Sequence, residues 1–141
     1  MTRGFEMLMK TMEAQRPIEL TLPAEPRMLL IIRLITAGVT ARAGLTVDAV
    51  EDVKMAVEEA CNCLLRCASC DSLKIKFSSE GGVLRMRVEG LGESTETHEI
   101  VGDCDEVQVI RYILESMVDD AHVIYDGSAL SAIEMAKSLG A

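Results

Sequence analysis

The chain has 141 residues, of which 49% are hydrophobic, 26% charged and 3% aromatic, and its formal net charge is −9. This length and composition fit one globular domain whose core is filled by aliphatic side chains and methionine, since tryptophan is absent. The negative charge argues against binding to nucleic acid or to an anionic membrane surface, because both require clustered lysine and arginine.

Two segments bear on localisation. The apolar run Met28–Ile32 is too short to span a bilayer, and Met1–Lys10 lacks the long apolar stretch of a secretion signal. We therefore expect a cytoplasmic protein that does not cross a membrane, in which the five cysteines are reduced thiols rather than disulfides.

The N-terminal extension, residues 1–16, carries a narrow apolar stripe at helical spacing, made by Phe5, Leu8, Met9 and Met12. Two interpretations remain open for this stripe. The segment is a partly ordered tail, as chain termini commonly are, or it is a helix that packs on a partner or on a second subunit. Residues 17–141 are expected to form one folded domain.

Hydrophobic periodicity and turn residues divide this domain into strands and helices. In chain order the predicted elements are a strand over Ile18–Leu22, a helix from about Pro26 to Gly44, a helix from Thr46 or Asp48 to about Cys70, strands over Leu73–Phe77 and Val83–Val88, a loop over Gly90–Asp103, a helix over Asp105–Val118, and a strand over Ala121–Tyr125. The second helix is predicted to bury a continuous stripe of Val50, Val53, Ala56, Val57, Ala60, Cys61 and Leu64.

The last segment, Ser128–Leu139, fits either a helical stripe or an alternating strand. The turn Asp126-Gly127 before it favours a strand that closes a hairpin, as Glu80-Gly81-Gly82 does between the two earlier strands. The order of elements then predicts a two-layer α/β sandwich of the α+β class. In such a fold, helices cover one face of a mixed or antiparallel sheet.

A family becomes recognisable between Ile18 and Leu65. This stretch has a strand, a corner Pro23-Ala24-Glu25-Pro26, a helix containing Ile31-Ile32-Arg33-Leu34, and a helix that contains Glu59-Ala60-Cys61. It resembles the RsbW-like anti-sigma factor serine kinases of the GHKL ATPase superfamily. The similarity continues more weakly to the C-terminus and covers about nine tenths of the chain.

The resemblance implies a Bergerat-type fold and a regulatory protein of transcription. Proteins of this family bind a sigma factor, form homodimers, and use Mg-ATP to phosphorylate a serine of an anti-anti-sigma partner. Arg33 corresponds to an arginine that contacts a partner, and Glu59 corresponds to the catalytic base. Because a fold does not fix a function, each site position has to be compared with the residue that stands there.

The first nucleotide motif of the family is a helical Glu followed four residues later by an Asn that holds Mg²⁺. Here Glu59 is followed at that spacing by Cys63, and a thiol is a poor ligand for a hard cation. A register shifted by one residue pairs Glu58 with Asn62 at the correct spacing. That shift would turn the apolar stripe of the helix away from the core.

The second motif is an Asp at a strand end that binds the adenine amino group, followed by a glycine. Gly90 stands at the Asp position, Gly92 matches the following glycine, and Glu89 should point to the opposite face of the sheet. The third motif is a glycine-rich turn that cradles phosphate, and it corresponds to the glycine-free residues 107–110. Acidic Asp103, Asp105 and Glu106 nearby should repel a triphosphate.

A cysteine cluster offers a different chemistry. Cys63, Cys67 and Cys70 are expected on one face of the second helix, where they could hold a metal with Cys104 as an extra ligand, or form a redox-sensing pair. Small buried side chains at a helix packing site are the simpler interpretation.

Taken together, the residues favour an anti-sigma-like regulator that binds a sigma factor or an anti-anti-sigma-type protein through a surface around Arg33. ATP and Mg²⁺ binding is expected to be lost or weakened, and no other cofactor is implied. The alternatives are an active ATP-dependent serine kinase that uses Glu59, or Glu58 with Asn62, and a cysteine-based metal or redox sensor.

Overall fold

The computed structural model describes residue 4, residues 16–93 and residues 104–140. In chain order its elements are β1 (Ile18–Pro23), the 3₁₀ turn η1 (Pro26–Met28), α2 (Leu29–Arg42), α3 (Val47–Cys67), β2 (Ser72–Glu80), β3 (Val83–Leu91), α4 (Cys104–Glu115), β4 (Asp120–Asp126) and β5 (Ala129–Ser138). The strands form one antiparallel sheet in the order β1-β2-β3-β5-β4. The predicted α+β sandwich is confirmed, in its antiparallel form.

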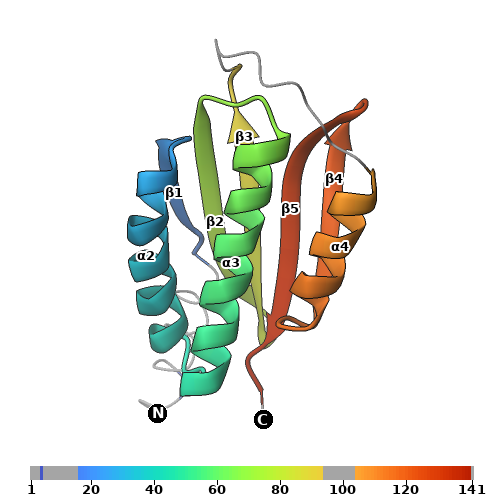
Figure 1. The fold of residues 1–141 in the computed structure, drawn as a ribbon. Helices are drawn as coiled ribbons and strands as arrows, with labels where there is room; N and C mark the ends of the chain where they lie inside the picture. Colours follow the sequence, from blue (N-terminus) through green and yellow to red (C-terminus); the bar gives the residue numbers. More distant parts are fainter. Residues whose placement is uncertain (1–3, 5–15, 94–103, 141) are drawn as a thin grey trace.

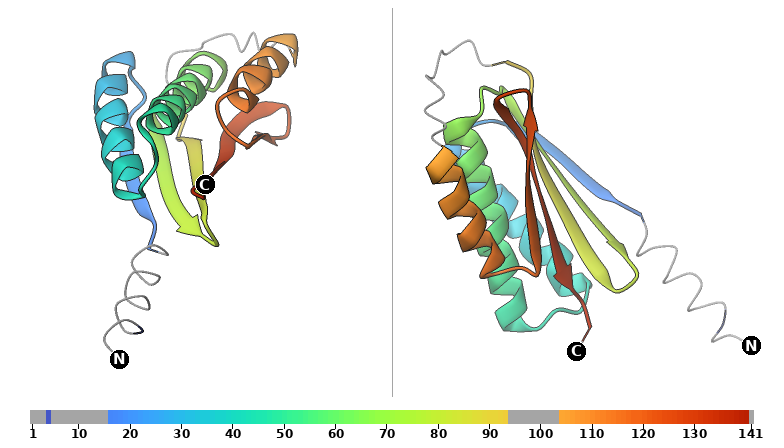
Figure 2. Two further views of the ribbon diagram at one scale, coloured as in Figure 1. Left: turned by 90° about the horizontal axis from the view of Figure 1, so that it is seen from below. Right: turned by 90° about the vertical axis from the view of Figure 1, so that its right-hand side faces the viewer.

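The three long helices lie side by side on one face of this sheet (Figure 1). Seen from below and from the side, they form a layer of their own, and none of them covers the other face (Figure 2). Alternation along β2 explains this arrangement, because Leu73, Ile75 and Phe77 are buried under the helices while Lys74 and Lys76 are only half-buried. The sheet therefore has one apolar and one charged face.

The hairpin of β2 and β3 fixes the register across the sheet centre. Gly81 and Gly82 have φ angles of 60° and 75°, in the left-handed region that glycine adopts at no steric cost. Glu80 consequently lies opposite Val83, and at the far end of the hairpin Ser72 lies opposite Leu91. β3 therefore continues through Gly90, which the sequence had assigned to a loop.

Helix α3 crosses the middle of the sheet. The Thr46 side chain caps it by accepting a hydrogen bond from the Ala49 amide at 3.2 Å, which decides between the two expected caps. All of its predicted stripe is buried except Val50, which is half-buried. The helix ends at Cys67 and not at Cys70, so the prediction that Cys70 lies on this helix is wrong.

The last segment is a strand. β5 pairs with β3 on one side and β4 on the other, and its Ile133 and Met135 are buried beneath the helices. α4 ends at Glu115, where it had been expected to reach Val118. Beyond Glu115 the Met117 amide donates to the carbonyl of Leu114, three residues back, which tightens the last turn.

Several predictions fall on parts that the structure does not describe. The apolar stripe of Phe5, Leu8, Met9 and Met12, most of the predicted loop over Gly90–Asp103, and the side chains of Cys104, Asp105 and Glu106 lie outside the described residues. Within the described part of the chain, no helix is long and apolar enough to cross a membrane.

Candidate functional site

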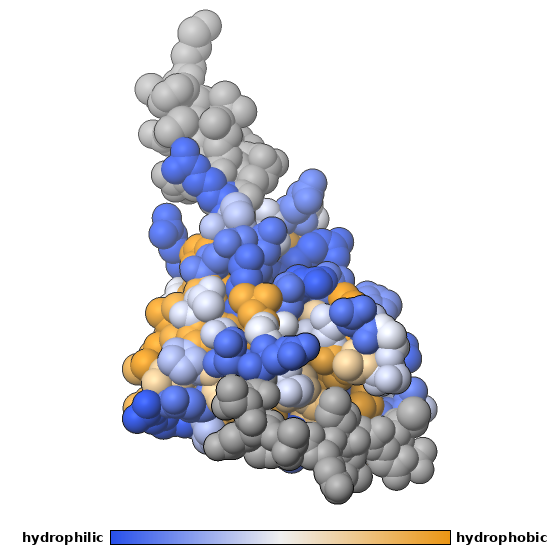
Figure 3. Space-filling model, turned by 90° about the horizontal axis from the view of Figure 1, so that it is seen from above, coloured by the Kyte–Doolittle hydropathy of each residue, from blue (hydrophilic) through white to orange (hydrophobic). Residues whose placement is uncertain are grey.

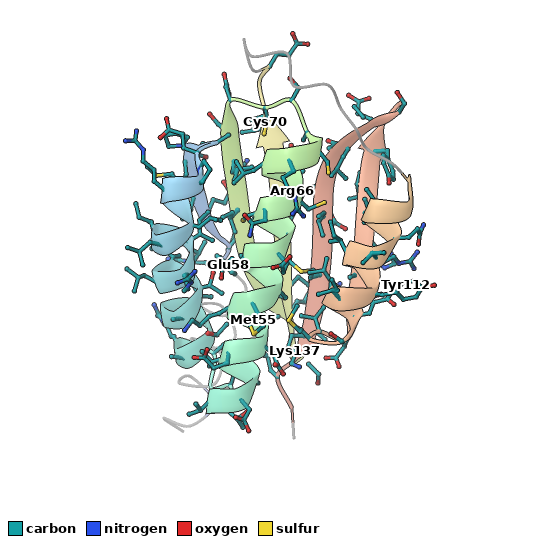
Figure 4. The ribbon with its side chains drawn as sticks, viewed as in Figure 1. Met55, Glu58, Arg66, Cys70, Tyr112 and Lys137 are labelled. Atoms are coloured by element: carbon teal, nitrogen blue, oxygen red, sulfur yellow. The ribbon has the colours of Figure 1, made fainter. Side chains whose placement is uncertain are left out.

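The elements that carry the three nucleotide motifs come together at one end of the molecule. The C-terminal end of α3, the end of β3 and the beginning of α4 all lie at the top of Figure 1. In Figure 4, Cys70 marks this end, and Glu58 lies about halfway down α3 on the side of α2.

The face that α3 turns to solvent carries the acidic residues, and the face that it turns to the sheet carries the cysteines. Glu59 and Asn62 are half-buried, whereas Cys63 is 0% exposed and belongs to the hydrophobic core. The residue four positions after Glu59 is therefore a thiol sealed against the sheet. It presents no oxygen ligand for Mg²⁺.

In the alternative pair of Glu58 and Asn62, the Glu58 carboxylate already has a partner on the neighbouring helix α2. The Arg33 guanidinium of α2 donates a hydrogen bond to the Glu58 carboxylate at 2.5 Å, and the two side chains are 43% and 26% exposed. Arg33 therefore meets an acidic group of its own chain. The core-facing stripe of α3 also keeps the register in which Glu59, and not Glu58, occupies the motif position.

At the end of β3, the position of the adenine-binding Asp is filled from elsewhere. A Cβ atom added to Gly90 would lie 3.1 Å from the Cys70 Cβ and 3.2 Å from its Sγ. These distances are tighter than ordinary van der Waals contact, so Cys70 occupies the space that a side chain at position 90 would need. Glu89 points to the open face of the sheet, as predicted, where it pairs with Arg87 at 3.2 Å.

Next to this contact lies a carboxylate that sequence reasoning missed. Gly92 has a φ of 72°, and a Cβ there would lie 2.3 Å from Asp71 Oδ1, so the Asp71 side chain packs directly over it. The Asp71 amide also donates to the Leu91 carbonyl at 2.9 Å. Extending the hairpin register beyond Ser72 and Leu91 would have placed Asp71 opposite Gly92.

The residues that correspond to the third motif, the phosphate-binding turn, lie inside a helix. Residues 107–110 belong to α4, with Val107 and Ile110 buried against the core while Gln108 and Val109 are exposed. Amide groups inside a helix are used by its own hydrogen bonds, so these residues do not form a phosphate cradle.

Two of the buried thiols have a pKa that is raised in the folded protein. Burial, together with the nearby Glu58 carboxylate, raises the pKa of Cys61 from 9.0 to about 12. Burial and then Asp71 raise the pKa of Cys70 as well. Cys61, Cys63, Cys67 and Cys70 form no disulfide, and the described residues contain no group of three or more candidate ligands that could hold a metal ion.

The motif residues do not line either of two hollows found on the described surface. One, of about 190 Å³, lies on the open face of the sheet among Lys76, Arg85 and Glu134. The other, of about 680 Å³, lies at the opposite end of the molecule from Cys70, beside the C-terminal end of α2.

Comparison with known proteins is consistent with this architecture. Residues 22–136 match the histidine kinase-like ATPase domain. The chain belongs to that family. Among curated relatives it is 33% identical to the serine-protein kinase RsbW of Bacillus velezensis, over 75% of this chain and 76% of that protein. It is 32% identical to RsbW of Bacillus subtilis over the same shares, and 28% identical to RsbW of Bacillus thuringiensis over 82% and 81%.

In this histidine kinase-like ATPase domain, the donor set does not fit Mg-ATP. The metal position holds the buried Cys63, the adenine position holds Gly90 with Cys70 against it, and the phosphate position lies within α4. Glu59 keeps the acidic side chain that the first motif requires. This geometry therefore gives no support to phosphoryl transfer from Mg-ATP.

Proposed function

We propose that this protein is an anti-sigma-like regulator that acts by binding a protein partner, either a sigma factor or an anti-anti-sigma-type protein. The observation that carries the proposal is an exposed apolar surface on α2 around Arg33. Membership of the histidine kinase-like ATPase family and identity to proteins named RsbW support the same role.

The α2 surface consists of Leu30, Ile31, Arg33 and Leu34. Leu30 and Leu34 are 59% and 65% exposed, Ile31 is 41% exposed, and α2 contains no acidic residue. Seen from above in Figure 3, hydrophobic colour follows the edge of the molecule where α2 lies, while the open sheet face is mostly hydrophilic. A helix that is apolar on its outer side as well as its inner side is typical of a surface that another protein covers.

The proposal includes the loss or weakening of ATP and Mg²⁺ binding. The buried Cys63, the contact of Cys70 with Gly90, and the helical residues 107–110 support it. Regulation would then come from competition between protein partners for α2 and not from phosphorylation by this chain.

The partner surface is tested by two substitutions on α2 and a matched control. Sigma factors and anti-anti-sigma-type proteins from the same genome are purified. Their binding to this protein is measured by isothermal titration calorimetry or biolayer interferometry. Arg33→Glu and Leu34→Ser are expected to weaken binding at least about tenfold, as central arginine and apolar contacts do. Arg111→Glu on α4 is the control, because Arg111 is 46% exposed and pairs with Glu115 at 3.1 Å.

Equal binding by all three variants and the wild type would remove α2 as the partner surface. Circular dichroism of each variant separates lost binding from lost folding. This check matters most for Arg33→Glu, which places a carboxylate against Glu58.

An ATP-dependent serine kinase is the second candidate, because the relatives are named serine-protein kinases and Glu59 is retained. Thermal unfolding with Mg-ATP distinguishes the two proposals. A nucleotide present at about 100 times its Kd stabilises the folded state by about 2.7 kcal/mol. No shift of the melting temperature is expected here, and a clear shift would return kinase chemistry to first place.

The family resemblance also leads us to propose a homodimer. Light scattering of the purified protein tests this directly, since the chain has a mass of 15.4 kDa. A molar mass near twice that value supports a dimer, and a mass near one chain contradicts it.

A further inference from the structure

A hollow on the open face of the sheet has no role in the proposed function. It has a volume of about 190 Å³ and lies on the side of the sheet opposite the three long helices (Figure 2). Its lining residues come from four neighbouring strands, β2, β3, β5 and β4. Sites for drug-sized ligands have volumes of roughly 300–1,000 Å³, so this smaller hollow fits a compact polar group.

The strand register explains why the hollow forms. Two rows of residues cross the open face there, each with one residue from β2, β3, β5 and β4. The first row is Ser78, Arg85, Ala136 and Asp120, and the second row is Lys76, Arg87, Glu134 and His122. Ser78 and Ala136 have short side chains among long charged ones, so space remains between the two rows.

Several of the charged side chains in the hollow already have partners. Arg87 donates hydrogen bonds to the carboxylate of Glu134 and, at 3.2 Å, to that of Glu89. On the far side of the hollow, the His122 Nε2 atom lies 2.8 Å from the Asp120 carboxylate. Both carboxylates that line the hollow are therefore engaged by a neighbour.

Three donors in the hollow remain available for a ligand. Within the described part of the chain, neither the Arg85 guanidinium nor the Ser78 hydroxyl makes a hydrogen bond or an ion pair. Lys76 lies 4.0 Å from the Glu19 carboxylate, and both of these side chains are about half exposed. Such a long surface ion pair holds the ammonium weakly, so a ligand can recruit Lys76.

The charge of these donors selects the class of ligand. Three cations line the hollow against two carboxylates, which leaves a positive excess in a chain whose net charge is −9. The two weakly engaged cations, Arg85 and Lys76, match a group with a charge near −2, as a phosphate monoester has at neutral pH. The planar guanidinium fork also fits two phosphate oxygens at once.

We propose that this hollow binds the phosphate group of a small anion, either inorganic phosphate or a phosphomonoester. Arg85 binds two of its oxygens, Ser78 donates to a third, and Lys76 supplies the second positive charge. The pairing of Arg87 with Glu134 holds that carboxylate away from the phosphate.

A nuclear magnetic resonance titration tests the site. Sodium phosphate is added to the ¹⁵N-labelled full-length protein at pH 7, with NaCl adjusted to keep the ionic strength constant. The amide signals of residues 76–78 and 85–87 are expected to shift and to saturate. Shifts that do not saturate, or that spread evenly over the chain, would overturn the proposal.

Two variants separate a site from general attraction between charges. Arg85→Gln is expected to weaken phosphate binding at least about tenfold. Lys74→Gln removes a positive charge from the same face of β2, but Lys74 pairs with Glu19 at 3.8 Å and does not line the hollow. It should change the affinity less than about twofold, and equal weakening by both variants would contradict the proposal. The same spectra show that each variant is folded.

Other anions distinguish the possible sources of the phosphate group. Tighter binding of glycerol 3-phosphate than of inorganic phosphate supports a site for phosphomonoesters, and the reverse order supports a site for free phosphate. Acetate carries one negative charge and should bind at least about tenfold more weakly than either. Acetate that binds as tightly as phosphate would overturn the proposed ligand class.

Thermal unfolding provides a second readout. Phosphate should raise the melting temperature above that in NaCl of the same ionic strength, because it binds the folded state. Phosphate also stabilises proteins generally by exclusion from their surface, so the informative quantity is the part of the gain that Arg85→Gln loses. Lys74→Gln should keep the whole gain. Equal gains in the wild type and both variants would mean that the hollow binds no phosphate.

Discussion

Because Cys70 packs against Gly90, the absence of an acidic residue at the adenine-binding position can be tested directly. Restoring the acidic residue by Gly90→Asp forces a side chain into space that Cys70 occupies, with a Cβ to Cβ distance of 3.1 Å. We expect this substitution to lower the free energy of unfolding by about 1–3 kcal/mol, measured by urea denaturation.

A double-mutant cycle identifies the cause of that loss. Cys70→Ala removes the Sγ atom that lies 3.2 Å from the added Cβ, so the double variant should recover part of the stability lost by Gly90→Asp. Additive effects of the two substitutions would show that Cys70 does not block position 90. The double variant is also the natural one in which to look for regained nucleotide binding.

Cys61 predicts a pH dependence of stability. Burial raises the pKa of its thiol from 9.0 to about 12 in the folded protein, so the unfolded chain loses this proton first. The stability contributed by the protonated thiol is fully present below pH 9 and is lost as the pH rises towards 12, by roughly 1 kcal/mol per pH unit.

This contribution is measured as a difference between two proteins, because lysine and tyrosine also titrate at alkaline pH. Urea denaturation of the wild type and of Cys61→Ala is compared at several pH values from 8 upward. Cys61→Ala should be less stable at pH 8 but lose stability less steeply above pH 9. Parallel curves for the two proteins would show that Cys61 does not titrate in this way.

At the scale of single elements, two glycines should respond to alanine in opposite directions. Gly38 lies inside α2 with open space around its Cα, so Gly38→Ala should stabilise the protein by about 0.5–1 kcal/mol. Gly82 has a φ of 75° in the turn between β2 and β3, so Gly82→Ala should destabilise it by a similar amount or more. Melting temperatures of both variants check the signs, and a shared sign would mean that one of these local geometries is wrong.

The elements themselves could mostly be predicted from the sequence, because their signals are local. Alternation in β2, the capping Thr46, the two glycine-containing turns and the stripe of α3 each depend on neighbours in the chain. The ends of helices were less accurate. The predicted helix ran to about Cys70, whereas the chain leaves α3 after Cys67 to enter β2.

The candidate site could be predicted only in part, because its details depend on contacts between distant segments. The residue type at each motif position is visible in the sequence. The filling of position 90 by Cys70, and the pairing of Arg33 with Glu58 across two helices, require the packed structure. Asp71 was missed because it stands between two elements and matches no motif, although the hairpin register points to it.

At the scale of the whole molecule, the sheet and the helical layer differ in how their charged residues are distributed. On the open face of the sheet, basic and acidic residues pair with one another, as Arg87 does with Glu89 and Glu134. On α3 the acidic residues Asp48, Glu51, Asp52, Glu58 and Glu59 outnumber the basic Lys54 and Arg66. The excess negative charge of the chain is therefore concentrated partly on the helical layer, where like charges repel.

This imbalance predicts that salt stabilises the protein. The chain has 23 acidic and 14 basic residues. Salt weakens both the repulsion among the excess acidic residues and the attraction within half-exposed ion pairs, and the loss of repulsion should be the larger effect. Raising NaCl from about 0.02 M to about 0.5 M at pH 7 should raise the melting temperature by a few degrees. Near the isoelectric point of about 4.7 the salt effect should largely disappear, because the net charge is then close to zero. A melting temperature that falls with salt at pH 7 would instead mean that paired charges, such as Arg33 with Glu58, outweigh the net repulsion.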